Sequence, residues 1–199
     1  MAELYVGSVG SYYAGNVFLT DSEMKTNANY IYRYLSLKGW SRSAVAGMLG
    51  NMETESTINP AIWQNLNPVE SNGYGLVQWT PSTNYTLWCT SEGLNPERMD
   101  SALARIEYEL ANGLQWIATD DYPLSFAEFK VSNESPEYLA QAFLRNYERP
   151  ADQNQPARST QARKWYSELT GDSPITPPSA EVKTKKMPFI LLWAAARRR

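Results

Sequence analysis

The sequence predicts an α+β fold that is mostly helical, with one small β region. Apolar residues recur at helical spacing in several segments, and most of these begin with a capping residue and end near glycine. A short glycine- and aromatic-rich segment at 73–79 has the character of a strand. With 199 residues, the chain can form one domain with a substantial core but is short for two.

The first half of the chain predicts an extended arm over residues 1–20, which are rich in Gly, Tyr and Ser and show no clear periodicity. Asp21 or Ser22 is expected to cap a helix that ends near Gly39, and Ser41 to cap a second helix. Gly47 and Gly50 weaken that second helix by roughly 1 kcal/mol each relative to alanine. We therefore expect these glycines to pack closely against a neighbouring element.

The remaining elements are predicted from the residues that typically begin and end helices. Asn59-Pro60 ends the second helix, because the residue before proline avoids the helical region. Residues 61–79 form the expected small β region. The helices expected after it are Thr80-Pro81 to about Glu92, Asp100 to before Gly113, Phe126 to Lys130, a helix opened by Ser135-Pro136, and Arg158 to Leu169.

Residues 21–171 are predicted to form the single domain, and residues 172–199 a linker with an apolar and basic C-terminal tail. Pro174, Pro177 and Pro178 follow Gly171, and eight apolar residues at 189–196 precede three arginines. Eight apolar residues are far fewer than the roughly 20 that a transmembrane helix needs. A docking tail or a linker is the favoured interpretation, and a segment that lies on a membrane surface or lodges in a pore is the alternative.

Composition excludes several kinds of site. The sequence has no histidine, so Ser-His and Cys-His nucleophile pairs and histidine metal sites are excluded. Its net charge of −3 does not suggest a nucleic-acid-binding protein, which usually presents a basic face. Cys89 is the only cysteine and cannot form an intramolecular disulfide. We expect no metal and no organic cofactor.

Three motifs stand out in order along the chain. They are Asn51-Met52-Glu53-Thr54-Glu55-Ser56-Thr57-Ile58-Asn59-Pro60, Gly73-Tyr74-Gly75-Leu76-Val77-Gln78-Trp79-Thr80-Pro81 and Tyr147-Glu148-Arg149-Pro150. Together they resemble the phage tail lysozyme family over roughly residues 17–171. The pattern of the first two is also shared loosely with goose-type lysozymes and lytic transglycosylases.

The resemblance implies a lysozyme-like fold, with a small β region after the catalytic helix, and cleavage of peptidoglycan glycan strands. It implies that Glu55 is the general acid. It further implies a location at the tail tip of a phage virion, action on the host cell wall, and other phage tail proteins as partners. A carboxylic acid shielded by apolar neighbours keeps its proton near neutral pH and can protonate a glycosidic oxygen.

Glu55 has an alternative interpretation as an ordinary solvated carboxylate at a helix end. The helix dipole opposes a negative charge there, which favours the catalytic role. Glu53 points roughly 200° away from Glu55 on a helix, so it is expected to be structural or paired with a basic residue. Glu70, in the loop before the strand, is the best candidate for a second catalytic carboxylate, and a solvated loop acid is the alternative.

The substrate-binding candidates surround the same motifs. Gln78 could bind an N-acetyl group or orient a water molecule, and Gly75 with Gly73 would allow close approach of the backbone to a sugar. A plain β-hairpin is the alternative for these glycines. Aromatic stacking on sugars is predicted for Trp63, Tyr74 and Trp79. The remaining candidates are Ser56, which follows the acid, and Tyr147, which either faces the cleft or only ends a helix. Glu148 is expected to be an ion-pair partner rather than a catalytic group.

The functional prediction is a muramidase that hydrolyses β-1,4 bonds between N-acetylmuramic acid and N-acetylglucosamine. One alternative is a lytic transglycosylase, which needs a single acid because a hydroxyl group of the sugar attacks the anomeric carbon. The other is a non-catalytic wall-binding or structural module of the tail tip that keeps the fold.

Overall fold

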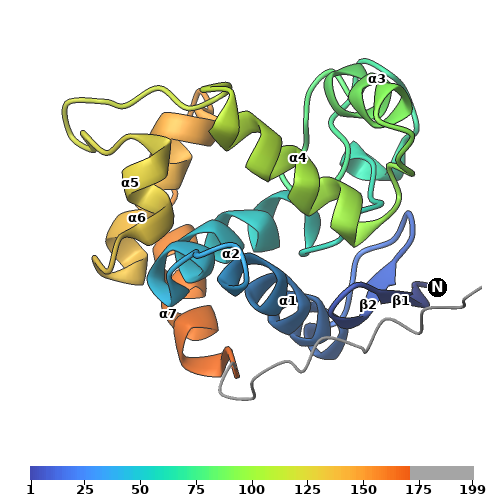
Figure 1. The fold of residues 1–199 in the computed structure, drawn as a ribbon, viewed down its shortest axis with the longest axis horizontal. Helices are drawn as coiled ribbons and strands as arrows, with labels where there is room; N and C mark the ends of the chain where they lie inside the picture. The colour runs from blue at the N-terminus through green and yellow to red at the C-terminus, as the bar shows by residue number, and fades with distance from the viewer. Residues whose placement is uncertain (171–199) are drawn as a thin grey trace, which may run out of the picture.

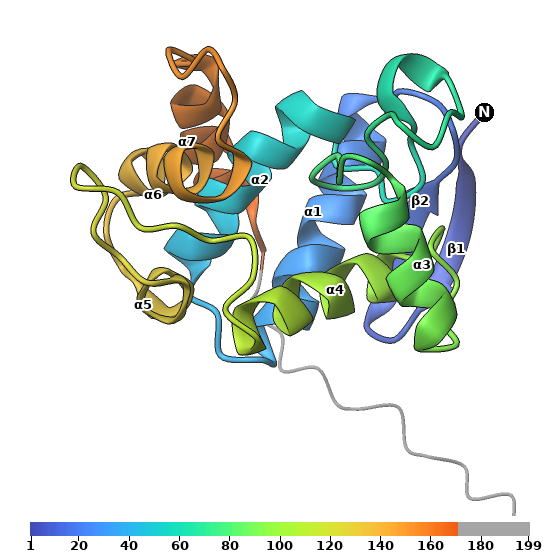
Figure 2. The same cartoon turned by 90° about the horizontal axis from the view of Figure 1, so that it is seen from above.

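The computed structural model describes residues 1–170, which form seven α-helices and a two-stranded antiparallel hairpin. The class is therefore α+β and mostly helical, as the sequence predicts. Helix α2 (Arg42–Ser56) runs through the middle of the molecule. Helices α6 (Pro136–Phe143) and α7 (Ala157–Glu168) lie on one side of it and α1 (Asp21–Ser36) on the other, as Figures 1 and 2 show.

The two glycines of α2 allow this close packing. A Cβ atom added at Gly47 would lie 2.8 Å from Leu139 Cβ on α6. One added at Gly50 would lie 2.4 Å from the carbonyl oxygen of Arg158 on α7. The sequence prediction that a neighbour packs closely against both glycines is confirmed.

Side-chain caps begin several helices where the sequence predicts them. Ser41 accepts a hydrogen bond from Ala44 N at the start of α2, and Ser135 caps α6. Helix α1 differs slightly, because its N-cap is Thr20, which forms a capping box with Glu23. At its other end, α2 stops at Thr57 in the left-handed conformation, with φ of 52°.

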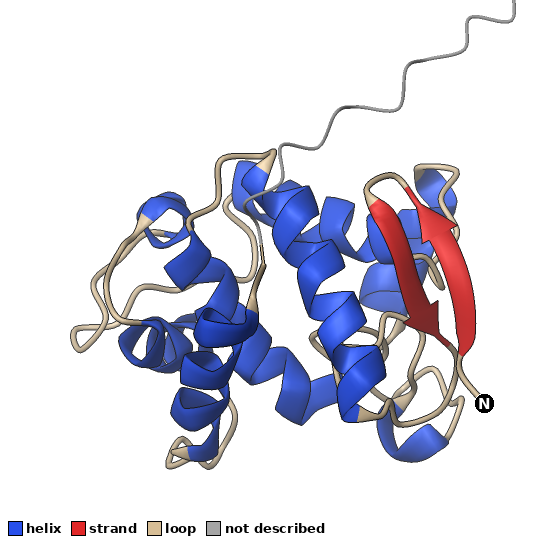
Figure 3. Cartoon of the chain, turned by 90° about the horizontal axis from the view of Figure 1, so that it is seen from below, coloured by secondary structure: helices blue, strands red, loops and turns tan. Residues whose placement is uncertain are grey.

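The N-terminal residues form a hairpin rather than the expected extended arm. Strands β1 (Glu3–Gly7) and β2 (Gly10–Ala14) pair antiparallel at one edge of the molecule, as Figure 3 shows. Buried Asn27 on α1 holds the hairpin, because its side chain bonds both the N–H and the carbonyl of Tyr13. Asp100 accepts hydrogen bonds from the backbone and side chain of Ser8 in the hairpin turn. Both contacts bridge residues distant in sequence, so local periodicity gave no sign of them.

The predicted β region after α2 contains no regular strand. Its segment consists of a short 3₁₀ turn at Gln64–Leu66 and two isolated bridges, which pair Tyr74 with Trp63 and with Trp79. Gly75 and Gln78 both have positive φ, 80° and 49°, so the backbone turns tightly between Tyr74 and Trp79. A tight turn therefore replaces the expected strand.

The remaining helical elements are α3, α4, α5 and η2. Helix α3 (Thr83–Ser91) begins after Pro81, and the N–H of its N-cap Ser82 bonds the carbonyls of Glu70 and Asn72. Helices α4 (Met99–Ala111) and α5 (Phe126–Val131) follow, and the π-helical turn η2 (Leu144–Glu148) continues α6.

Among residues 1–170, no helix is long and apolar enough to span a membrane. The tail predicted at residues 172–199 lies outside the described residues.

Candidate active site

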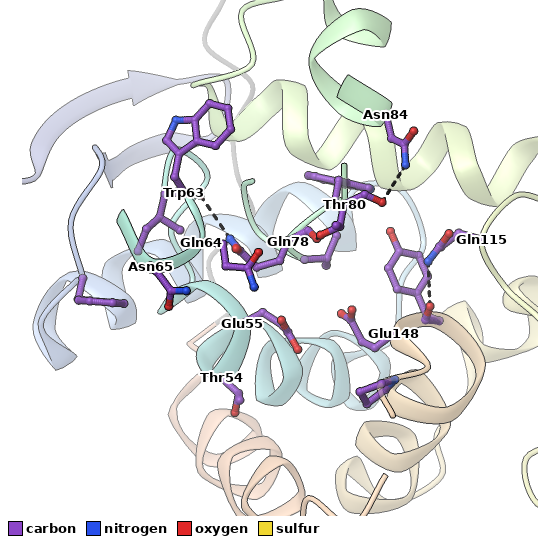
Figure 4. Close-up of a pocket in the computed structure, with 16 residues that line it drawn as sticks. Thr54, Glu55, Trp63, Gln64, Asn65, Gln78, Thr80, Asn84, Gln115 and Glu148 are labelled. Carbon is purple, nitrogen blue, oxygen red and sulfur yellow. Dashed lines mark hydrogen bonds between the residues drawn. The ribbon is translucent and has the colours of Figure 1, made fainter. Parts of the chain in front are cut away.

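A cleft of about 510 Å³ opens between the end of α2, the loops at 62–80 and the segment at 147–150. Figure 4 shows two carboxyl side chains on one side of this space, those of Glu55 and Glu148. The opposite side carries mostly amide and hydroxyl groups, including those of Gln64, Gln78 and Thr80. The cleft is thus polar, with its acidic groups gathered on one side.

Glu55 lies in the last turn of α2 and lines the cleft, as predicted. Its environment differs from the apolar shield that the sequence suggested. The guanidinium group of Arg158 on α7 forms an ion pair with it, and the Glu55 side chain is 22% exposed. Arg158 itself is buried and also donates hydrogen bonds to Asn51 and Gln155. Because Asn51 and Gln155 hold Arg158 in place, it fixes the direction of the Glu55 carboxylate.

Glu148 has the more shielded environment of the two acids. It ends η2 and is half-buried, and its Oε1 is fully buried without a hydrogen-bond partner among the described residues. Burial raises its pKa well above the ordinary glutamate value, and the nearby Glu55 carboxylate raises it further. No basic group of the described chain lies within ion-pair distance of Glu148. The prediction of an ion-pair partner is therefore wrong, since desolvation favours the neutral acid.

The other two acids of interest lie away from these groups. Glu53 forms an ion pair with Lys164 at 2.8 Å, which confirms its predicted pairing with a basic residue. Glu70 is exposed and is not among the residues that line the cleft. Its backbone carbonyl accepts hydrogen bonds from Ser82, so this loop is tied down while its carboxylate stays outside the cleft.

Several predicted binding residues do line the cleft: Trp63, Gln78, Trp79 and Tyr147. Gln78 donates hydrogen bonds from its side-chain amide to the carbonyls of Gly75 and Ile62. The Gln78 side-chain oxygen accepts no hydrogen bond from the described residues, so it is available to a ligand.

The buried carboxylate of Glu109 holds two of these aromatic residues. Trp79 Nε1 donates to it at 2.9 Å, Tyr147 donates its hydroxyl hydrogen, and Arg105 adds an ion pair at 2.8 Å. Burial raises the pKa of Glu109, and these donors act in the opposite direction. Glu109 therefore fixes one wall of the cleft from behind.

Three predicted residues support the cleft without lining it. Ser56 is buried and donates its hydroxyl hydrogen to the carbonyls of Met52 and Leu76, which ties the end of α2 to the turn. Tyr74 is buried beside Trp63, with their rings 4.7 Å apart. Gly75 approaches the carbonyl of Pro60 and the ring of Trp79, so its close contacts are with protein.

Sequence reasoning missed Arg158 and Glu109, and it expected an ion pair for Glu148 that the described residues do not form. Arg158 and Glu109 lie on helices, where a single charged residue is usually solvated. The only local signal was the position of Glu148 in the Tyr-Glu-Arg-Pro motif.

Comparisons with known proteins identify the family of the chain. A family model described as phage tail lysozyme matches residues 26–169. Morphogenesis protein 1 of Bacillus phage B103 is 50% identical over 161 residues, which cover 80% of this chain. These residues make up 44% of that relative, so the chain matches less than half of its length. The matched family segment includes both carboxyl groups of the cleft and leaves out the N-terminal hairpin. The chain belongs to the phage tail lysozyme family.

Proposed function

We propose that this chain is a glycoside hydrolase that cleaves the β-1,4 bonds between N-acetylmuramic acid and N-acetylglucosamine in peptidoglycan. The observation that carries the proposal is the position of Glu55, fixed at the end of α2 and directed into the cleft. A carboxyl group so placed can act on a glycosidic bond that lies across the cleft. Membership of the phage tail lysozyme family supports the same activity.

The lining of the cleft suits a polymer of N-acetylated sugars. Amide side chains such as Gln64, Gln78 and Gln115 can exchange hydrogen bonds with acetamido and hydroxyl groups. Trp63 and Trp79 add aromatic surface against which a sugar ring can stack. None of these contacts requires a metal ion or an organic cofactor.

We place this activity in a phage virion, at the tail tip, where it opens the host cell wall locally during entry. The relative from Bacillus phage B103 bears the name of a morphogenesis protein, which supports assembly into a particle with other tail proteins.

A second carboxyl group in the cleft favours hydrolysis over a lytic transglycosylase reaction. Hydrolases of this type use a pair of carboxyl groups, one as the acid and one as a base or nucleophile. A transglycosylase can work with one acid, because the sugar supplies the attacking hydroxyl group. Glu148 beside Glu55 provides the pair.

Incubation of the full chain with purified Bacillus cell walls, followed by mass spectrometry of the products, tests the proposal. We expect new reducing ends on N-acetylmuramic acid. Products with 1,6-anhydro ends would instead identify a transglycosylase. Binding to the walls without any glycan cleavage would replace the proposal with a non-catalytic wall-binding module.

A further inference from the structure

Glu148 has a buried carboxyl oxygen that the surrounding protein does not satisfy. Its Oε1 is fully buried and has no hydrogen-bond partner among the described residues. The side chain nevertheless lines the cleft and lies beside Glu55 (Figure 4). A buried carboxylate without partners is costly, whereas the neutral acid is tolerated and can donate a hydrogen bond to a ligand.

The charged groups around Glu148 come from four parts of the chain. Burial raises the pKa of Glu148, and the carboxylates of Glu55 on α2 and Glu109 on α4 raise it further. The guanidinium groups of Arg158 on α7 and Arg149 after η2 act in the opposite direction without reversing the shift. Glu148 therefore keeps its proton more readily than an ordinary glutamate does.

Glu55, in contrast, has a basic partner. Arg158 forms an ion pair with Glu55 and is held in place by Asn51 and Gln155. One guanidinium group balances the charge of one carboxylate. Arg149 is exposed and donates to the carbonyls of Gln115 and Asn146, so Arg158 is, among the described residues, the one buried guanidinium group beside the two acids. If both acids were ionised they would share that one group, which repulsion and burial both disfavour.

We propose that Glu148 is the second catalytic carboxyl group of this cleft, and that Glu55 and Glu148 together carry one proton. This inference rests on the proposed glycosidase function. It replaces Glu70, which lies outside the cleft, as the partner of Glu55. Because the two groups are close, they titrate as a pair rather than as two independent acids.

A shared proton supplies what glycoside hydrolysis needs. The proton held by the pair passes to the glycosidic oxygen as the bond between that oxygen and the anomeric carbon breaks. The ionised member of the pair stabilises the positive charge that develops at the anomeric carbon. Water then adds to that carbon, and the proton that water loses returns to the pair. One water molecule is consumed, and the protein regains its starting state.

Kinetics of Glu148→Gln on soluble glycan fragments tests the proposal. Glutamine keeps the size and neutrality of the protonated acid but cannot deliver or accept the proton. We expect kcat to fall about 100-fold or more, which is the usual contribution of a general acid or base. KM should change little. The pH dependence of kcat should no longer show the titration of the Glu55 and Glu148 pair.

Glu53→Gln is the matched control, because Glu53 lies on the same helix as Glu55 but pairs with Lys164 outside the cleft. It should keep the wild-type kcat. Cleavage by Glu148→Gln at the wild-type rate and pH optimum would overturn the proposal while leaving the glycosidase function intact. Failure of the wild-type chain to cleave glycan would instead overturn the proposed function.

Carbon-13 NMR of the free full chain, labelled at the glutamate carboxyl carbons, gives a readout without substrate. The resonance that disappears in Glu148→Gln should belong to a protonated carboxyl group at neutral pH. In Glu55→Gln, the Glu148 resonance should titrate at lower pH, because the neighbouring carboxylate is gone. A Glu148 carboxyl group that is already ionised at neutral pH would contradict the shared proton.

Discussion

Tyr147 donates the hydrogen of its hydroxyl group to the buried carboxylate of Glu109, which joins the cleft wall to helix α4. Trp79 donates its indole N–H to the same side chain, and Arg105 balances its charge. Two aromatic residues of the cleft thus depend on one buried acid. The wall is held rigid from behind, so the cleft keeps its shape before any substrate enters.

Replacement of Glu109 with alanine should destabilise the fold strongly. The change leaves the Arg105 charge and two aromatic donors without an acceptor, and breaking a buried pair in this way costs about 3–5 kcal/mol. Urea denaturation followed by circular dichroism would measure the loss. Exposed Glu134 provides the control, because its replacement with alanine should change stability by less than about 0.5 kcal/mol. Equal stabilities of the two variants would contradict this role of Glu109.

Replacement of Gly50 with alanine should also destabilise the protein, although alanine favours helices. The new Cβ would lie 2.4 Å from Arg158 O and 2.8 Å from Ala162 N, both backbone atoms of α7. Overpacking of this kind costs about 1–3 kcal/mol, against a gain of roughly 1 kcal/mol in helix propensity. We expect a net loss of stability and lower glycan cleavage, because α7 carries the arginine that holds Glu55.

Thr54→Ala is the control for this variant. Thr54 is exposed on the same helix and bonds only the side chain of Gln161. Its thermal unfolding should stay close to that of the wild-type protein. A Gly50→Ala variant that is more stable than wild type would show that α7 can move away from α2 without cost.

Replacement of Glu148 with glutamine should stabilise the protein in a pH-dependent way. Burial raises the pKa of Glu148 in the folded chain above the ordinary value of 4.5. As pH rises above 4.5, the unfolded chain loses this proton first, so the wild-type fold loses stability until the pH passes the folded pKa. Glutamine does not ionise and avoids this loss.

The stability advantage of Glu148→Gln should therefore be small below pH 4.5 and grow towards neutral pH. Thermal unfolding of both proteins over this range measures it. A difference in stability that stays constant with pH would mean that Glu148 does not titrate in the way its burial implies. A stability gain accompanied by lost activity is the usual sign of a group kept for function.

The helices were predictable from sequence because their signals are local. Ser41 and Ser135 cap their helices through backbone groups three residues away, and glycines mark several helix ends. The hairpin at 3–14 was not predictable in the same way. Its stability depends on Asn27 and Asp100, which are distant in sequence from the strands that they hold.

The cleft was predictable only in part, because some of its contacts also join residues that are distant in sequence. Glu55 was visible in sequence because a carboxylate at a helix end is unfavourable without a specific role. Its partner Arg158 lies 103 residues further along the chain and resembles any arginine on a helix. The burial of Glu148 depends on how η2 packs, so its sequence neighbours could not reveal that it would be the better shielded acid.

The most direct test of the account compares the wild-type chain with Glu55→Gln on purified Gram-positive cell walls, by loss of turbidity. We expect clearing by the wild-type chain and little or none by the variant, with circular dichroism showing that the fold is kept. Equal clearing by both proteins would contradict the role of Glu55 and of the cleft built around it.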